Sequence, residues 1–293
     1  MTEDASRERD SFSSPPPPPL LTVSVLGVGL MGASLVRRLY ATTGHRVVLF
    51  NRTRAKAERL LHDLISQEER AEPPQPHEAR LSLAATAEEA IQRSDCVLSM
   101  LFDHQANKEV LYSALLHLNT NHNERGGGGK KEERRKWIVV LTDMSPKQSL
   151  SLAQDISSLA HGKYVYVEAP LLASQTDVLN GTARVFLSYL PSSCPCSSSS
   201  CSCSSSSSSS SSCSSCSSSC SSSSSSSSAA AAASGGACDV EEVRELLKCF
   251  GKCRAVGNVP KANLCKLALL VMPLMQLLAT AISLGSPSSA LLS

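Results

Sequence analysis

A glycine-rich turn between two apolar runs constrains the fold of this chain more than any other feature. The apolar run SVLGV leads into Gly27-Val28-Gly29-Leu30-Met31-Gly32, where a helical pattern begins, and the second apolar run, HRVVLF, follows that pattern. A strand that passes through a G-x-G-x-x-G turn into a helix opens a Rossmann-type unit. The spacing therefore predicts two parallel strands joined by a helix that packs on the sheet.

The three glycines have different roles in such a turn. We expect Gly27 to permit the tight bend, Gly29 to let a pyrophosphate approach the backbone, and Gly32 to let the helix pack against the strand. The free backbone N–H groups at the start of the helix then point at the anion. The predicted dinucleotide contacts in this turn are Gly27, Val28, Gly29, Leu30, Met31 and Gly32.

The residues after the second apolar run indicate which dinucleotide is bound. An NAD enzyme usually carries an acidic residue there, which holds the ribose hydroxyls. Here the run ends in Asn51, Arg52 and Thr53, with no carboxylate. A guanidinium forms charge-assisted bonds to phosphate, and a threonine hydroxyl adds a donor. The sequence therefore predicts NADP as the cofactor, with Arg52 on its 2′-phosphate.

Apolar strands and amphipathic helices alternate along the chain as far as residue 190. Strand patterns occupy 96–102, 137–145, 163–170 and 183–190, and helical patterns occupy 53–69, 87–93, 104–118 and 146–160. This alternation is typical of an α/β fold whose sheet is covered on both faces. We therefore predict a Rossmann-type, doubly wound parallel sheet over residues 20–190, with a flexible insertion at about 119–136.

Two further segments have biased composition. Residues 1–19 are polar and proline-rich, without the apolar core of a secretory signal, and we expect a disordered tail. Residues 191–237 are mostly serine, cysteine and alanine, and such a low-complexity insertion buries too little apolar surface to order itself. Most of the 12 cysteines lie there at irregular spacing, so no metal site is predicted. The formal net charge of +2 gives no reason to expect nucleic acid as a partner. We expect a cytoplasmic protein, with an organelle left open.

Residues 238–293 return to a helical pattern that includes a strongly apolar run. Residues 267–284 carry no charged side chain, and the run is near the lower length limit for a membrane span. Pro273, Gln276 and Thr280 interrupt it. We favour a buried helix between domains and keep a membrane span as the alternative.

Several segments, in order along the chain, resemble the β-hydroxyacid dehydrogenases. This group includes 3-hydroxyisobutyrate dehydrogenase and the glyoxylate/succinic semialdehyde reductases, and it is related to 6-phosphogluconate dehydrogenase. The resembling segments are VSVLGVGLMGASLVRRLYATTGHRVVLFNRTRAKAERL, SDCVLSMLFD, TDMSP, VEAPLLASQTDVLNGTARVFLS and VGNVPKANLCKLALL. The resemblance covers roughly residues 22–284 without the low-complexity insertions. It implies hydride transfer between NADP and a small hydroxyacid or aldehyde acid that carries a carboxylate.

The resemblance also implies roles for individual residues. Lys266 matches the family's lysine, a general acid/base that takes the hydroxyl proton as the hydride leaves. Leu101 and Phe102 lie in the segment that passes beneath the nicotinamide. The loop that binds the substrate carboxylate corresponds to Leu172, Ala173 and Ser174.

The chain departs from the family at several of these positions. Leu172 replaces a serine, Ala173 and Ser174 replace two glycines, and Leu270 replaces an asparagine. A leucine cannot pair with a buried carboxylate, so a catalytically degenerate NADP-binding or interaction protein is the alternative function. The chain also ends at Ser293, soon after Lys266. We therefore expect a remnant of the family's all-helical C-terminal domain, as in a truncated gene model, and a homodimer through its apolar helix.

Overall fold

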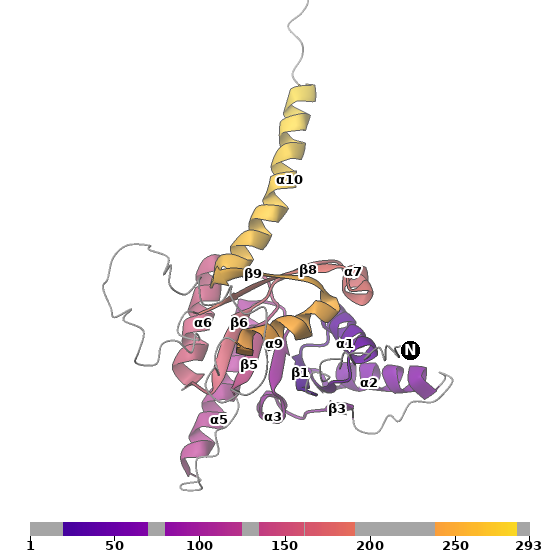
Figure 1. Cartoon of the computed structure of the whole chain (residues 1–293), viewed down its shortest axis with the longest axis vertical. Helices are drawn as coiled ribbons and strands as arrows, with labels where there is room; N and C mark the ends of the chain where they lie inside the picture. The colour runs from indigo at the N-terminus through magenta and orange to yellow at the C-terminus, as the bar shows by residue number, and fades with distance from the viewer. Residues whose placement is uncertain (1–19, 70–79, 125–134, 161, 191–237, 286–293) are drawn as a thin grey trace, which may run out of the picture.

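The computed structural model describes residues 20–69, 80–124, 135–160, 162–190 and 238–285 (Figure 1). The predicted tail at 1–19 and the serine-rich segment at 191–237 lie outside these residues, as does most of the predicted insertion at 119–136. The strands are β1 (Thr22–Leu26), β2 (Arg46–Phe50), β3 (Leu81–Leu83), β4 (Cys96–Ser99), β5 (Lys136–Val140), β6 (Tyr164–Glu168), β7 (Leu171–Leu172), β8 (Ala183–Tyr189) and β9 (Gly251–Asn258).

The helices connect these strands. They are α1 (Leu30–Thr42), α2 (Arg54–Glu69), α3 (Ala87–Arg93), α4 (His104–Asn107), the π-helix η1 (Lys108–Tyr112), α5 (Ser113–Glu124), α6 (Pro146–Ala160), α7 (Gln175–Asn180), α9 (Cys238–Leu247), the 3₁₀-helix η4 (Lys248–Phe250) and α10 (Lys261–Gly285). Most of the predicted elements are confirmed, whereas β3, β7 and α7 were not predicted because each is too short to show a period.

Within the described residues, the strands form one sheet in the order β3-β2-β1-β4-β5-β6-β8-β7, and β9 pairs with β8. The first six strands are parallel, and their order is that of the Rossmann fold. Strand β8 runs antiparallel to β6 and β7. The predicted doubly wound α/β fold is therefore confirmed, with an antiparallel extension at one side.

The core lies on both faces of this sheet. Successive residues of a strand point to opposite faces, so Val139 of β5 joins one buried cluster with Leu35 of α1, whereas Ile138 joins the other with Leu115 of α5. Each cluster is built mainly from buried aliphatic side chains, with a few aromatic ones. The continuous apolar character of the central strands follows from this burial on two sides.

The C-terminal part differs from the helical segment that we predicted. Strand β9 runs parallel to β8, from the pair Ala183 and Gly251 to the pair Tyr189 and Asn258. The sheet therefore includes residues on both sides of the serine-rich segment, and the prediction of a purely helical segment over 238–293 is wrong at 251–258. The strand is largely half-exposed and carries polar side chains, so its apolar alternation is too weak to predict a strand.

Helix α10 leaves the sheet and projects away from the rest of the described chain (Figure 1). Its apolar side chains are exposed, with Met272, Leu274 and Leu277 at 62%, 64% and 68%. By length and composition, Lys261–Ser283 would be able to cross a membrane, and none of its most apolar stretch is buried. The described residues therefore do not bury this helix, in contrast to our prediction.

Candidate functional site

The turn between β1 and α1 requires glycine at its first and last positions. Gly27 has φ +93°, and a Cβ atom added to it would lie 2.5 Å from the carbonyl oxygen of Met100. A Cβ atom added to Gly32 would overlap the carbonyl of Gly27. The N–H of Gly27 also donates to the carbonyl of Phe50 over 2.9 Å. The turn is therefore held against the ends of both β2 and β4, with no room for a side chain at Gly27 or Gly32.

The middle glycine has different surroundings. A Cβ atom added to Gly29 would meet no other atom within 4 Å, so the backbone there borders open space. Gly29 is also the N-cap of α1, without a side-chain cap, and the first turn of α1 has no acidic residue. The first N–H groups of this 13-residue helix are therefore free to bind an anion. These features fit a dinucleotide pyrophosphate.

A cleft of about 710 Å³ opens at this turn. Every predicted cofactor-binding residue except Val28 lines it. The lining residues are Gly27, Gly29, Leu30, Met31, Gly32, Asn51, Arg52, Thr53, Lys56, Met100, Leu101, Phe102, Asp103, Gln105, Ala106, Glu109 and Val110. The structure thus brings together residues from the ends of β1, β2 and β4, the edge at which Rossmann folds bind ligands.

Val28 and Asn51 hold the floor of the cleft in place. Val28 is buried, and its N–H donates to Oδ1 of Asn51 over 3.1 Å. The Nδ2 group of Asn51 donates to the carbonyl of Thr53 over 2.9 Å. Asn51 therefore ties the glycine turn to the loop between β2 and α2, which sets the position of Arg52.

Two cations lie where that loop borders the cleft. Arg52 and Lys56 are both exposed, and neither has an ion-pair partner among the described residues. Arg54, by contrast, pairs with Glu58 over 2.7 Å. Lys56 was not among the predicted cofactor-binding residues. It lies four residues after Arg52, so both cations are near the start of α2. Their free charges fit a phosphate group.

Arg52 also borders a second cavity, of about 340 Å³, that continues from the cleft. Residues 83–88, from the end of β3 to the start of α3, form its other wall. Asn51, Arg52 and Val110 line both spaces. The two spaces therefore adjoin at the loop that carries Arg52.

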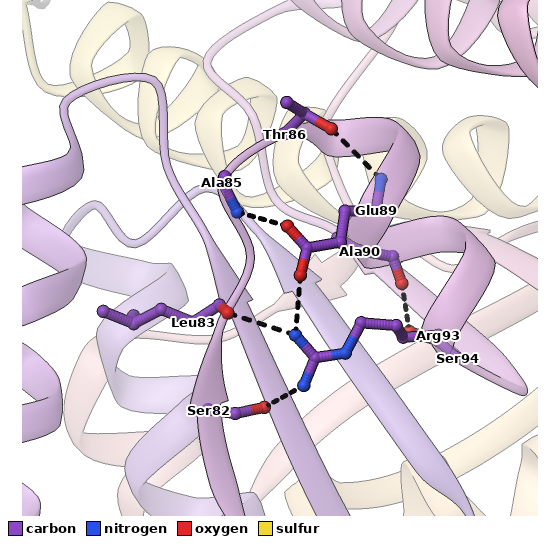
Figure 2. A network of polar contacts seen from close by, with 8 residues as sticks. All are labelled: Ser82, Leu83, Ala85, Thr86, Glu89, Ala90, Arg93 and Ser94. Carbon is purple, nitrogen blue, oxygen red and sulfur yellow. Dashed lines mark hydrogen bonds and ion pairs between the residues drawn. The ribbon is translucent and has the colours of Figure 1, made fainter.

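Figure 2 shows the polar network that fixes this other wall. The hydroxyl of Thr86 accepts from the N–H of Glu89 over 3.2 Å, and the Glu89 carboxylate accepts from the N–H of Ala85 over 2.7 Å. Thr86 thus caps the start of α3, and Glu89 binds the backbone one residue before that cap. Arg93 donates to the same carboxylate over 2.9 Å and to the carbonyl of Leu83 over 3.2 Å. The hydrogen bond from the Ala85 N–H, and to a smaller extent the one from Arg93, holds the pKa of Glu89 below its ordinary value.

A second network supports the loop that follows β4. Asn107 is fully buried, and its Nδ2 group donates to the carbonyl of Asp103 over 2.8 Å and to the hydroxyl of Thr142 over 3.0 Å. The Thr142 hydroxyl donates to the carbonyl of Leu101 over 2.9 Å. The exposed ring of Phe102 thus stands on a fixed backbone at the edge of the cleft.

Lys266 lies next to this second network without lining the cleft. Its amine is 2.5 Å and 2.6 Å from the two carboxylate oxygens of Asp143, the residue after Thr142. The side chain of Lys266 is 12% exposed, and that of Asp143 is 63% exposed. The structure therefore places the predicted acid/base at the carboxyl end of β5, and Asp143 is a partner that the sequence did not reveal.

The predicted substrate-binding residues lie apart from the cleft. Leu172 belongs to β7 and pairs with Arg184 of β8, and Ala173 packs against the core. The hydroxyl of Ser174 binds Asp177 over 2.7 Å and caps α7, which lowers the pKa of Asp177. None of the three lines the cleft, so their binding of a substrate carboxylate stays a prediction.

No cluster of metal ligands is present among the residues that the structure describes. Cys96, Cys249, Cys253 and Cys265 are free thiols. Burial raises the pKa of Cys249 and of Cys253 to about 12, which leaves both unreactive near neutral pH.

Comparison with known proteins points to one family. The family model described as the NAD binding domain of 6-phosphogluconate dehydrogenase matches residues 22–189. No curated protein sequence matches the chain.

Three solved structures with a similar fold are distant from this chain in sequence. A 3-hydroxyisobutyrate dehydrogenase from Mycobacterium tuberculosis with L-serine has 13% identity and a TM-score of 0.58, covering 90% of this chain and 64% of its own. A reductive aminase from Aspergillus terreus in complex with NADPH4, cyclohexanone and allyl amine has 21% identity and a TM-score of 0.53, covering 89% and 63%. A variant imine reductase from Myxococcus stipitatus in complex with NAD+ has 19% identity and a TM-score of 0.55, covering 90% and 64%. The chain thus spans 63–64% of the length of these proteins.

Proposed function

The chain belongs to the family of the NAD binding domain of 6-phosphogluconate dehydrogenase, among the β-hydroxyacid dehydrogenases, and on that premise we propose that it is an NADP-dependent oxidoreductase. The observation that carries the proposal is the glycine turn, which opens onto a cleft bordered by Arg52 and Lys56. The fold and the cleft support a nicotinamide dinucleotide, and the two cations support the phosphorylated form.

The residues that would hold the cofactor follow the ends of three strands, β1, β2 and β4. The first turn of α1 would hold the pyrophosphate through its N–H groups, and Arg52, Thr53 and Lys56 would hold the 2′-phosphate. The cavity beyond Arg52 would accommodate the adenine, and Leu101 and Phe102 would lie on the nicotinamide side. The bound nicotinamide supplies the chemistry, since it accepts or donates a hydride.

The substrate is a small hydroxyacid or aldehyde acid. A carbonyl that gains a hydride on its carbon must also gain a proton on its oxygen, and Lys266 is the group that donates it; in the reverse direction the deprotonated amine takes that proton back. Its amine lies on Asp143, one residue from the Thr142 hydroxyl that supports the Leu101 carbonyl. On this proposal the amine would leave Asp143 for the substrate oxygen when substrate binds.

A second function is favoured by the substrate loop. Leu172 and Ala173 offer no side-chain donor to a carboxylate, and the Ser174 hydroxyl already caps α7. A chain that binds NADP without turning over a hydroxyacid would have this arrangement. We therefore keep a degenerate NADP-binding protein as the second candidate.

We also propose a homodimer in the cytoplasm, formed through α10. Exposed apolar side chains surround this helix, and a second copy would remove them from water. A membrane span is the competing arrangement, and an organelle the competing location.

Turnover measurements separate the two candidate functions. The full chain receives NADPH with glyoxylate or succinic semialdehyde, and NADPH oxidation is followed by its absorbance. Turnover that Lys266→Ala abolishes, with NADPH affinity preserved, supports the oxidoreductase. Binding of NADPH without turnover on either substrate supports the second candidate.

A further inference from the structure

A buried carboxylate joins the first turn of α10 to the sheet. Glu168, at the end of β6, is fully buried, and both of its oxygens accept hydrogen bonds. Ser149 of α6 donates to Oε1 over 2.7 Å, and Ser188 of β8 donates to Oε2. Asn263 of α10 donates to Oε1 with its side-chain amide and with its backbone N–H, the latter over 3.3 Å. A buried carboxylate is costly to leave without partners, so these contacts fix α6, β6, β8 and α10 relative to one another.

Asn263 extends this network to the loop that carries Asp143. The Oδ1 atom of Asn263 accepts from the N–H of Met144 over 3.3 Å. Met144 directly follows Asp143, whose carboxylate binds the amine of Lys266. Asn263 and Lys266 are one helical turn apart and lie on one side of α10. Two residues one turn apart on the helix therefore hold two consecutive residues of the loop.

Beyond this first turn, α10 has little other support. Ala262 and Asn263 are buried, whereas the side chains from Leu267 to Ser283 are exposed. The direction of the helix, and with it the position of the Lys266 amine, thus depends on its first turn. A lysine side chain is long and flexible. The position of its amine therefore depends on how the backbone of the helix is held and on the group that the amine binds.

We propose that Glu168 and Asn263 are positioning residues for Lys266. Glu168 fixes Asn263, and Asn263 fixes the first turn of α10 against the loop after β5, so that the amine rests on Asp143. Neither Glu168 nor Asn263 lines the cleft, so both act through Lys266 and not on the cofactor. The inference rests on the proposed function, in which Lys266 takes the hydroxyl proton.

Chemical reactivity of the Lys266 amine tests this positioning without relying on turnover. The full chain and its Asn263→Ala variant are labelled with a trace of acetic anhydride over a range of pH, and each lysine is quantified by mass spectrometry. We expect Lys266 to react several-fold faster in the variant, with a changed pH profile. Lys261, exposed on the same helix, should react equally in both proteins. NADPH affinity should be unchanged.

Two further variants make the result specific. Asn119→Ala removes an amide that binds the carbonyl of Leu159 at the far end of α6, and it should leave Lys266 unchanged. Glu168→Gln keeps the shape of the side chain and should give a smaller rise in Lys266 reactivity. This variant tests the same proposal if Asn263→Ala does not fold.

Each outcome of this experiment has a stated consequence. Equal Lys266 reactivity in the folded wild type and variants overturns the positioning role, as does an equal rise in Asn119→Ala. The expected labelling pattern in a chain that binds NADPH without turnover supports the positioning role while overturning the proposed activity.

Discussion

The amine of Lys266 lies 2.5 Å and 2.6 Å from the two carboxylate oxygens of Asp143, a residue 123 positions earlier in the chain. This contact joins α10, which follows the serine-rich segment, to the end of a central strand of the sheet. Asp143 directly follows Thr142, whose hydroxyl donates to the carbonyl of Leu101 at the edge of the cleft. The predictions below follow from this arrangement and from the cleft itself.

The cations beside the cleft should select the phosphorylated cofactor. Replacing Arg52 with aspartate removes a charge-assisted bond and adds repulsion, so NADPH affinity should fall on the order of ten- to a hundredfold. NADH affinity should change little. Fluorescence titrations with both cofactors measure this, and Arg59→Asp is the matched control, because Arg59 is exposed on α2 outside both cavities. Equal losses for NADPH and NADH would refute the role of Arg52.

Two glycines of the turn should respond in opposite ways to a methyl group. Gly27→Ala forces a Cβ atom against the carbonyl of Met100 at a positive φ, so the thermal midpoint of unfolding should fall. Gly29→Ala meets no protein atom and should leave the midpoint unchanged, while weakening cofactor binding because the methyl group occupies pyrophosphate space. Thermal unfolding and NADPH titration of both variants check this, and normal NADPH binding by Gly29→Ala would contradict it.

Asn107 should contribute to stability through its buried hydrogen bonds. In Asn107→Ala, Ser99 and Thr142 lose their amide partner, and the free energy of unfolding should fall by about 2 kcal/mol. Denaturant unfolding measures this change. Ser158→Ala, an exposed helix position on α6, is the control and should change the value by less than about 0.5 kcal/mol. A drop no larger than that of the control would show that the network has no such role.

His45 should make the protein less stable in mild acid. Burial, and then the charge of Arg80, lower the pKa of His45 below its ordinary value of 6.5. The unfolded chain therefore binds a proton more readily, so the stability from neutral His45 is present above about pH 6.5 and is lost as the pH falls toward the folded-state pKa. Unfolding of wild type and His45→Gln across this range tests the prediction. The variant should lose less stability on acidification, and parallel curves would contradict it.

The sequence was sufficient to predict the Rossmann sheet, because its strands are buried on both faces and its helices have one apolar face. The glycine turn was equally readable, since Gly27 and Gly32 are needed for local backbone reasons. Strand β9 was not predicted, because its pairing with β8 depends on contacts across the serine-rich segment. Local apolar periodicity carries no information about such a distant partner.

The candidate site could be predicted only in part, because some of its residues depend on contacts between distant parts of the chain. Asn51, Arg52 and Thr53 were found because they directly follow a recognisable strand. Asp143, Glu168 and Asn263 were not, since a carboxylate or amide shows its role only when the fold brings its partner near. The capping role of Ser174 likewise depends on Asp177, which begins a helix too short to predict.

Cofactor titration tests the central claim most directly. The folded full chain is titrated with NADPH and with NADH, and the nicotinamide fluorescence is followed at constant salt. We predict saturable binding of NADPH and weaker binding of NADH, with the difference removed by Arg52→Asp. A chain that is shown to be folded by circular dichroism and yet binds neither dinucleotide would contradict the account.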